Sequence, residues 1–456
     1  MFRQLLVAAL VGLALSAPSN KIDESLARAL QSKGVLNIFI EFKQTTEEVL
    51  SRVDNMRFES RGQKITVMKT QLEELAATVQ KNAISILNKK GLKHESFWIS
   101  NQLFVQGVSA EDVLALAALS EVAEIYEEKI IEIEQPIISN ATINAEWGVE
   151  KIEAPAAWAL PGGNNGQGVV VSNIDTGVRA THQALRANFR SSYGWFDPYT
   201  RTATPTDNNG HGTHTMGTIA GSNGVGVAPG AQWIACRGCS TSSCTQAALT
   251  SCGQFITCPT NAQGGSPNCA QAPDLVSNSW GGGQGDTWYN SVISGWQSAG
   301  IVPLFSQGNS GPACGTANSP ADATNVIAVG STTSADGVSS FSSRGPSVRG
   351  GVKPDIAAPG TNVRSAWYTS DTAYNTISGT SMACPHAAGA AAILLANNRN
   401  LSYTQVKNLL QNNADRNLGA ATTCGGTPIT TTPNNIYGYG RINIRKALSA
   451  AVLGNY

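Results

Sequence analysis

The stretch Ser378-Gly-Thr-Ser-Met-Ala-Cys-Pro-His386 decides the fold, and it leads directly into Ala387-Ala-Gly-Ala-Ala-Ala-Ile-Leu-Leu395. The first half is turn-like, and the second half is a strong, apolar helix former. We therefore expect Ser381 where a tight turn enters a buried helix, beside free N–H groups and the positive end of the helix dipole. A serine placed there is a candidate nucleophile, because its reaction builds an oxyanion nearby. The alternative is a serine that only caps the helix.

Two further stretches supply the partners that such a serine needs. Val169 to Ile174 predict a buried parallel strand that ends at Asp175, where open α/β sheets place their sites. His211 follows a glycine turn and begins a second helix of small residues. Asp175, His211 and Ser381, in this order, can act as orienter, general base and nucleophile. The alternative for His211 is a buried structural histidine.

The three motifs together resemble those of the subtilisin-like serine proteases, the subtilases. The details are most similar to the bacillopeptidase F-like branch, in Lys151-Ile-Glu-Ala-Pro-Ala-Ala-Trp158, Asn209-Gly-His-Gly-Thr-His-Thr-Met-Gly-Thr-Ile-Ala-Gly221 and Asn278-Ser-Trp-Gly-Gly-Gly283. The resemblance covers about residues 147–450. It implies a three-layer αβα domain with a mostly parallel sheet, and a serine endopeptidase acting on proteins or peptides.

The resemblance also implies the remaining site residues. Asn309 stands where the family has its oxyanion asparagine, although Ser306-Gln307 replaces two alanines. Ser279, Trp280, Gly281 and Gly282 match the strand that pairs with extended substrate. Asn318 matches the floor of the specificity pocket and makes it polar. The alternative for these segments is ordinary turn and loop structure. The family treats His386 as structural, and His214 is expected to pack internally.

The net charge of the 456 residues is zero, but it is unevenly spread. Residues 21–150 hold 14 Lys/Arg and 20 Asp/Glu, and residues 151–456 hold 16 and 11, giving balances of −6 and +5. Opposite signs suggest that the two parts dock, with the acidic residues 121–134 against a basic surface. Basic residues are scattered in the second part, which argues against a nucleic-acid partner.

The N-terminus predicts export. Arg3 precedes the apolar run Leu5 to Leu15, and Ala14-Leu-Ser16 fits cleavage after Ser16. The run is too short to span a membrane. We therefore predict a signal peptide over residues 1–16 and a secreted, extracellular monomer without a membrane partner.

All 9 cysteines lie after residue 235, and in a secreted chain they predict disulfides. An odd number leaves one free. Related subtilases often carry a cysteine beside the nucleophile, so the resemblance makes Cys384 the free one. The pairing of the other eight stays open, and a zinc site at Cys236-x2-Cys239 is the alternative.

Residues 21–135 predict a small α+β domain. We expect strands at Val35–Phe42, Phe97–Gly107 and Val122–Ile133, with helices over residues 45–90 and Ala110–Leu119. This order is similar to the ferredoxin-like subtilase prodomains, which act as chaperones and then as inhibitors. The alternative is an unrelated binding domain.

Residues 136–146 lack periodicity and predict an exposed processing linker ahead of a peptidase domain over 147–456. Asn140 and Asn400 lie in acceptor sequences for N-glycosylation. The family's calcium-binding insertion is missing from Ala220–Pro229. No metal ligand or certain cofactor is therefore assigned, and calcium is left open as a structural ion.

These observations predict a secreted serine endopeptidase made as a self-processing zymogen. Two other functions stay open. One is a catalytically silent binding protein on the same fold, against which the intact Asp175, His211, Ser381 and Asn309 argue. The other is a transpeptidase or ligase, which uses the same triad and excludes water.

Overall fold

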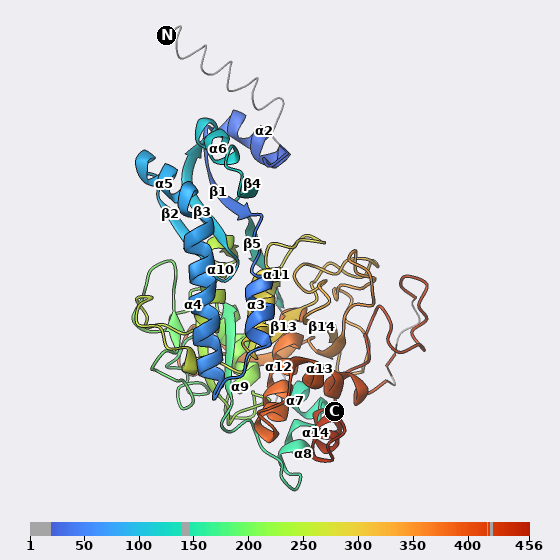
Figure 1. The fold of residues 1–456 in the computed structure, drawn as a ribbon. Helices are drawn as coiled ribbons and strands as arrows, with labels where there is room; N and C mark the ends of the chain where they lie inside the picture. The colour runs from blue at the N-terminus through green and yellow to red at the C-terminus, as the bar shows by residue number, and fades with distance from the viewer. Residues whose placement is uncertain (1–19, 139–145, 417, 420–422) are drawn as a thin grey trace.

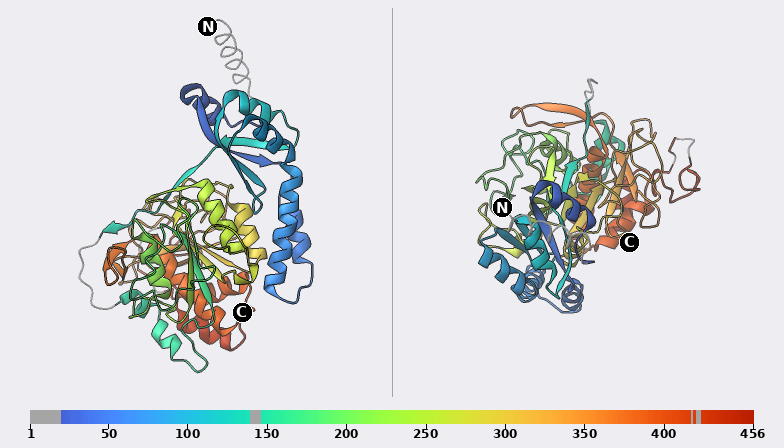
Figure 2. Two further views of the ribbon diagram at one scale, coloured as in Figure 1. Left: turned by 90° about the vertical axis from the view of Figure 1, so that its left-hand side faces the viewer. Right: turned by 90° about the horizontal axis from the view of Figure 1, so that it is seen from above.

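The computed structural model describes residues 20–138, 146–416, 418–419 and 423–456; the expected signal peptide (residues 1–16) and Asn140 lie outside these ranges. The described chain forms a small N-terminal unit on top of a larger C-terminal unit (Figure 1). Helices α3 (Glu47–Asp54) and α4 (Arg61–Val79) leave the small unit as an arm that runs along the large unit (Figure 2).

The small unit is an α+β fold around a four-stranded antiparallel sheet in the order β2-β3-β1-β4. Its β-α-β-β-α-β chain order is ferredoxin-like, as expected. The elements beside the arm are α2 (Glu24–Lys33), β1 (Val35–Phe42), α5 (Lys81–Lys90), β2 (His94–Phe97), β3 (Gln102–Ser109), α6 (Ala110–Ala117) and β4 (Val122–Glu127).

Two segments expected to be single strands are divided in the structure. Phe97–Gly107 is not one strand, because a turn with Asn101 at φ 50° makes it the hairpin β2–β3. Val122–Ile133 is interrupted after Glu127: β4 stays in the small sheet, while β5 (Ile130–Ile133) pairs with strands of the large unit. Apolar residues alternate through both halves, so the sequence period gave no sign of this break.

The large unit is built on a seven-stranded parallel sheet in the order β15-β14-β13-β11-β7-β9-β8. Its strands are buried on both faces, as expected for a parallel sheet between helices. They are β7 (Val170–Asp175), β8 (Trp195–Phe196), β9 (Gln232–Arg237), β11 (Leu275–Asn278), β13 (Val302–Ser306), β14 (Ile327–Thr332) and β15 (Ile356–Pro359).

Helices cover both faces of this sheet, so the predicted three-layer αβα architecture is confirmed. One core contains α8 (Ala154–Trp158), α9 (His211–Ala220), α12 (Thr380–Asn397), α13 (Tyr403–Asn412) and α14 (Ile444–Val452). The other core contains α10 (Gln246–Thr257) and α11 (Asn290–Ser298). The first core also contains Val149 of the short helix α7 (Trp147–Lys151), and the second contains Cys269 of the short helix η1 (Cys269–Gln271).

Helix α12 is buried from Thr380 to Leu395, which explains its run of small residues. A Cβ at Gly389 would lie 2.5 Å from Val227 Cβ, so the helix backbone packs directly against its neighbour. Larger side chains would overfill this core. The stretch that carries Ser381 is therefore held rigidly.

Four disulfides join the eight other cysteines and leave Cys384 free, which confirms both expectations; the pairs are Cys236–Cys252, Cys239–Cys244, Cys258–Cys269 and Cys314–Cys424. The zinc alternative is wrong, because Cys236 and Cys239 belong to disulfides. Burial raises the pKa of the Cys384 thiol to about 12, which makes this cysteine unreactive.

The expected charge complementarity does not join the two units. The ion pairs across their contact are Arg61–Asp274 at 3.4 Å and Lys129–Asp286 at 2.8 Å, so the small unit contributes the cations. In the described ranges, no carboxylate of residues 121–134 forms an ion pair with the large unit. The two units are joined mainly by apolar burial and hydrogen bonds. The net charges had predicted that the small unit would contribute the anions of the contact.

A search of the described ranges for membrane-crossing helices found none with the required length and apolar character.

Candidate active site

Asp175 ends β7 near the middle of the large sheet, at the carboxyl edge where the sequence places it. Its carboxylate is buried, and both oxygens are held. Oδ1 accepts the Thr176 N–H at 2.7 Å, and Oδ2 accepts the Thr215 hydroxyl at 3.2 Å. The carboxylate therefore has one fixed orientation.

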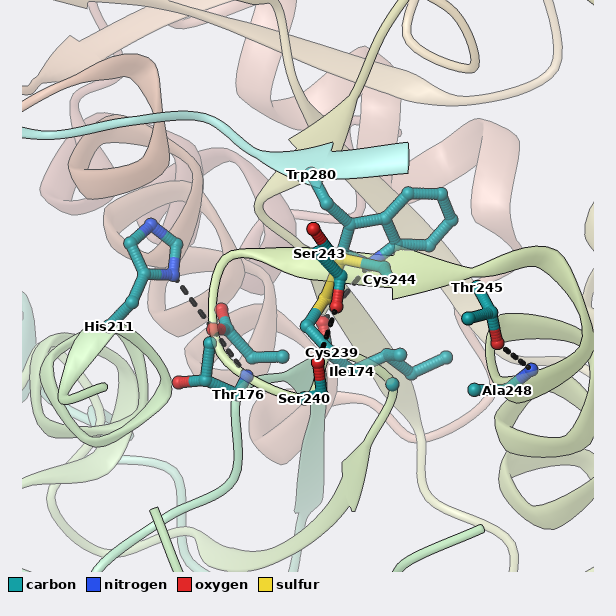
Figure 3. The surroundings of a disulfide bond; sticks show 12 residues. Ile174, Thr176, His211, Cys239, Ser240, Ser243, Cys244, Thr245, Ala248 and Trp280 are labelled. Atoms are coloured by element: carbon teal, nitrogen blue, oxygen red, sulfur yellow. Dashed lines mark hydrogen bonds and ion pairs between the residues drawn. A yellow bond between two sulfur atoms is a disulfide. The ribbon is translucent and has the colours of Figure 1, made fainter. Parts of the chain in front are cut away.

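His211 begins α9 directly after Gly210, which has φ 103°. A Cβ at Gly210 would lie 2.6 Å from Tyr368 and 2.7 Å from Trp367, so the turn requires glycine. His211 Nδ1–H donates to Asp175 Oδ1 at 2.7 Å, the bond drawn from His211 in Figure 3. Nε2 is buried and has no hydrogen-bond partner among the described residues. This nitrogen is the one that would accept a proton from a serine.

The Asp175 carboxylate controls the charge on His211. Burial alone would lower the pKa of His211, but the charge and hydrogen bond of Asp175 raise it above the usual value. The charges of Asp207 and Glu134 act in the same direction. The protonated ring that forms during proton transfer is therefore stabilised.

Ser381 is the second residue of α12, and the residue at the N-cap is Gly379. The alternative in which Ser381 caps the helix is therefore wrong. Pro385 lacks an N–H, which leaves the Ser381 carbonyl outside the helix ladder. Ser279 Oγ donates to that carbonyl at 3.1 Å and thus fixes the turn.

The Ser381 hydroxyl faces a peptide rather than the imidazole. Its Oγ lies 3.4 Å from the Glu134 carbonyl oxygen and 3.4 Å from the Ser279 carbonyl oxygen. Helices α9 and α12 pack against each other, but in the described chain no hydrogen bond joins Ser381 to His211 Nε2. The structure thus pairs Asp175 with His211 and presents Ser381 to the segment that lies across it.

Asn309 follows β13 and is turned toward the same segment. Its Oδ1 accepts both the N–H and the hydroxyl of Thr380, each at 2.9 Å. Because Thr380 holds the oxygen, Nδ2 points away from Thr380 and donates to the Gln135 carbonyl at 3.3 Å. Asn309 is therefore more than a turn residue, since its amide is aimed at a peptide beside Ser381.

Residues 130–138 cross the cleft in extended form. Strand β5 pairs antiparallel with β10 (Ser243–Thr245) on one side and with β12 (Trp280–Gly281) on the other. Past Ser381, β6 (Ile137–Ile138) pairs with β17 (Tyr374–Ser378), which also pairs with β16 (Val363–Ala366). This is the main-chain pairing by which an extended peptide adds to a sheet edge.

The residues expected to bind substrate line this segment in different ways. The Trp280 indole is buried and donates to the Ile174 carbonyl at 3.0 Å, so only the Trp280 backbone pairs with β5 (Figure 3). A Cβ at Gly281 would lie 2.7 Å from the Ser319 carbonyl oxygen, whereas a Cβ at Gly282 would meet nothing within 4 Å. Asn318 Nδ2 donates to the Glu134 carboxylate at 2.8 Å.

Two other histidines near Ser381 are structural, as expected. Burial lowers the pKa of His214 to about 3 and that of His386 to about 4. His214 donates to the Val363 carbonyl at 3.0 Å, and His386 donates to the Met382 carbonyl at 2.8 Å. Both rings stay neutral and hold the backbone, unlike His211, whose Nε2 has no hydrogen-bond partner among the described residues.

Within the described ranges, no three His, Cys, Asp or Glu side chains gather in a way that could hold a metal ion.

Comparison with known proteins identifies the fold family. A model of the subtilase family matches residues 166–440. Bacillopeptidase F of Bacillus subtilis (strain 168) is 32% identical over 487 residues, which cover 95% of this chain and 33% of that protein. Alkaline serine exoprotease A of Vibrio alginolyticus is 38% identical over 323 residues, 68% of this chain and 55% of that protein. The chain belongs to the subtilase family.

The resemblance to subtilases of the bacillopeptidase F-like branch is thereby confirmed. This subtilase spans 33% and 55% of the lengths of those two relatives. Subtilisin Savinase of Lederbergia lenta is 33% identical over 305 residues, 66% of this chain and 97% of that protein. The family match begins at residue 166 and therefore does not include the small N-terminal unit.

Two further residues of this site, Thr380 and Glu134, were not expected from the sequence. Thr380 orients Asn309, and its position directly before Ser381 was the only available signal. Glu134 fills the pocket beside Ser381 but stood out only as one of several acidic residues. Its signal was its place at the end of an alternating strand, just before Gln135-Pro136.

Proposed function

We propose that this subtilase is a secreted serine endopeptidase that hydrolyses peptide bonds in proteins and peptides. The observation that carries the proposal is the extended segment across Ser381, with the Asn309 amide on one of its carbonyls. A substrate bound in the same way presents its carbonyl to the hydroxyl.

The chemistry follows from the positions of the side chains. As Ser381 Oγ attacks the carbonyl carbon, His211 Nε2 takes its proton, and Asp175 holds the ring and stabilises its charge. The Ser381 N–H and Asn309 Nδ2 donate to the oxyanion; in the uncut chain this amide donates to the next carbonyl along, that of Gln135, so it shifts to the attacked carbonyl during the reaction. His211 then protonates the leaving amine, and water hydrolyses the acyl-enzyme by the reverse sequence of proton transfers.

A fluorophosphonate probe tests this proposal, because it labels only an activated serine. We expect the mature protein to be labelled on Ser381, and His211→Ala to abolish labelling. An unlabelled protein would favour the silent binding protein. Product analysis with an added amine nucleophile would reveal a transpeptidase or ligase.

Asn309→Ala should lower kcat by about 10²–10³-fold and leave KM nearly unchanged, which is the cost of losing one such donor in subtilisin. The physical reason is that the amide bonds more strongly to the oxyanion than to the ground-state carbonyl. Steady-state kinetics of the mature enzyme on a peptide substrate measure both constants. An effect confined to KM would place Asn309 outside the oxyanion hole.

We further propose that the small unit is a chaperone and inhibitor that the enzyme itself removes. In the uncut chain, residues 130–135 cover Ser381 and occupy both strand-pairing edges of the cleft. Any substrate must displace them, so the precursor is inactive toward other proteins.

The helical arm gives the inhibitor a second anchor, away from the cleft. Met68 and Leu72 of α4 share a buried apolar cluster with Trp296 of α11. At the far end of the arm, Arg61 Nε donates to the Ala299 carbonyl at 2.8 Å and Nη1 donates to the Ala272 carbonyl at 3.3 Å. These bonds are charge-assisted and half-buried, so they should hold the cut unit in place.

Arg61→Ala should therefore weaken retention of the cut small unit. Loss of several charge-assisted bonds predicts a dissociation constant about 10²-fold higher. The measurement is the recovery of peptidase activity as the processed complex is diluted. Arg57→Ala, at an exposed position of the same arm, is the matched control and should behave as wild type. Equal retention by the Arg61 and Arg57 variants would show that the arm is not an anchor.

Asn400 remains a proposed glycosylation site, since it is exposed in the turn between α12 and α13.

A further inference from the structure

We propose that the pocket beside Ser381 selects glutamate on the acyl side of the cut bond, and that Glu134–Gln135 is the bond at which the chain processes itself. This inference rests on the proposed peptidase function and names its substrate class.

Four contacts place Glu134 as the residue whose carbonyl is attacked. Its carbonyl oxygen lies 3.4 Å from Ser381 Oγ, and its N–H donates to the Ser279 carbonyl at 3.4 Å. Its carboxylate accepts Asn318 Nδ2 at 2.8 Å and the Asn309 N–H at 3.0 Å. The side chain is therefore held at its end as well as at its backbone, and the residue is 8% exposed.

The pocket is built around Asn318. The Asn318 N–H donates to the Gln307 carbonyl at 3.1 Å, which ties the pocket floor to its wall. A Cβ at Gly308 would lie 2.6 Å from Asn318 Nδ2, and Gly308 has φ 109°. Because residue 308 has no Cβ, the Asn318 amide can occupy the space that such an atom would take.

The chemistry of the pocket favours a carboxylate. The Asn309 N–H can only donate, and Asn318 Nδ2 donates to the other oxygen, so a carboxylate satisfies both. An apolar side chain would leave both donors unpaired, and such sites reject analogues that lack the polar group. Glutamine would satisfy both only if the Asn318 amide rotated. The aspartate side chain is one methylene shorter, so its carboxylate would not reach the Asn309 N–H and Asn318 Nδ2.

The pocket holds the Glu134 carboxylate with two hydrogen-bond donors, and the charge of a protonated His211 also favours the ionised carboxylate. Burial raises the pKa of Glu134 above its usual value, and the bonds from Asn318 and Asn309 act against this rise. Among the described Lys and Arg side chains, none forms an ion pair with Glu134. No ion pair with a described residue favours aspartate over glutamate in this pocket. The length of the side chain therefore decides which carboxylate bonds to Asn318 and Asn309.

Glu132 provides an internal control, because it is exposed on the same segment whereas Glu134 is buried. We would express the full-length precursor as wild type, Glu134→Leu and Glu132→Leu, and follow processing by gel and N-terminal sequencing. The wild type should mature to a chain that begins at Gln135. Glu134→Leu should slow processing on the order of 10²-fold, and Glu132→Leu should process like the wild type.

A second variant tests the pocket itself. Asn318→Leu added to Glu134→Leu should restore processing, because an apolar pair then replaces a polar pair and no donor is left unsatisfied. In parallel, the mature wild type would be given peptides with the residues of 130–136 and Glu, Gln or Leu at the position of Glu134. The kcat/KM should fall in that order. Asn318→Leu should reverse the preference between Glu and Leu, whereas Asn455→Leu, at an exposed C-terminal position, should keep it.

Equal processing of Glu134→Leu and Glu132→Leu, or equal cleavage of the Glu and Leu peptides by the wild type, would overturn the pocket assignment and leave the peptidase proposal intact. A wild-type start at another residue would overturn the assigned processing bond. If the wild type neither matures nor takes the fluorophosphonate label, the proposed function itself fails.

Discussion

The Ser381→Ala precursor is expected to remain at full length and to hydrolyse peptides on the order of 10⁶-fold more slowly than the wild type. This magnitude is the one seen when the triad serine of subtilisin, a member of the same family, is removed. The physical reason is that Ser381 Oγ, 3.4 Å from the Glu134 carbonyl oxygen, is the only hydroxyl that the structure holds against that carbonyl in the described ranges. The measurements are N-terminal sequencing and turnover of a peptide substrate.

The control for this variant is active wild-type enzyme, added in trans. If the Ser381→Ala precursor is folded, the added enzyme should remove its small unit, which separates loss of chemistry from loss of structure. Maturation of Ser381→Ala expressed alone would show that another protease performs the cut. Activity within tenfold of the wild type would show that Ser381 is not the nucleophile.

The positions of Asp175, His211 and Ser381 in the fold could be predicted because their signals are local. Asp175 ends a run of buried strand residues, and His211 and Ser381 each follow a glycine turn at the start of a small-residue helix. Each motif carries its own turn, strand or helix signal within about ten residues. The parallel sheet then brings the strand ends and helix starts to one edge, as the general rule for α/β folds requires.

The path of the N-terminal segment could not be predicted, because it depends on distant partners. The alternation from Val122 to Ile133 fits one strand as well as two, and the pairing of β5 with β10 and β12 decides where the second strand goes. The net charges of the two units also predicted the wrong side chains at their contact. Arg61 and Lys129 supply the cations across the contact although their unit is acidic overall, because the local arrangement of side chains, and not the net charge, decides which groups pair.

The polar residue Asn318 could be singled out from the sequence, but its contact with Glu134 could not. Asn318 was expected at the floor of a specificity pocket, but no local pattern indicated that Glu134 would lie against it. The two residues are 184 positions apart, and only the fold brings them together. The replacement of two alanines by Ser306-Gln307 also stays without an explanation, since the described residues provide no hydrogen-bond partner for either side chain.

Asp175→Asn should lower kcat by roughly 10³–10⁴-fold and shift the acidic limb of the pH–rate profile to lower pH. The Thr176 N–H donates to the same oxygen that accepts His211, so the amide oxygen of asparagine takes this place and the geometry survives without the charge. His211 must be neutral to act as a base. In the wild type its pKa is raised, so activity is lost as pH falls through that raised value.

Without the carboxylate, burial dominates and lowers the His211 pKa, so the ring stays neutral to a lower pH and the acidic limb follows it. The variant would be matured by a tagged wild-type enzyme, which is then removed, and kcat/KM would be measured across pH. Asp371→Asn is the matched control, because it removes an exposed carboxylate and should leave the limb in place. An unchanged limb in Asp175→Asn would show that a group other than the Asp175–His211 pair controls the acidic side of the profile.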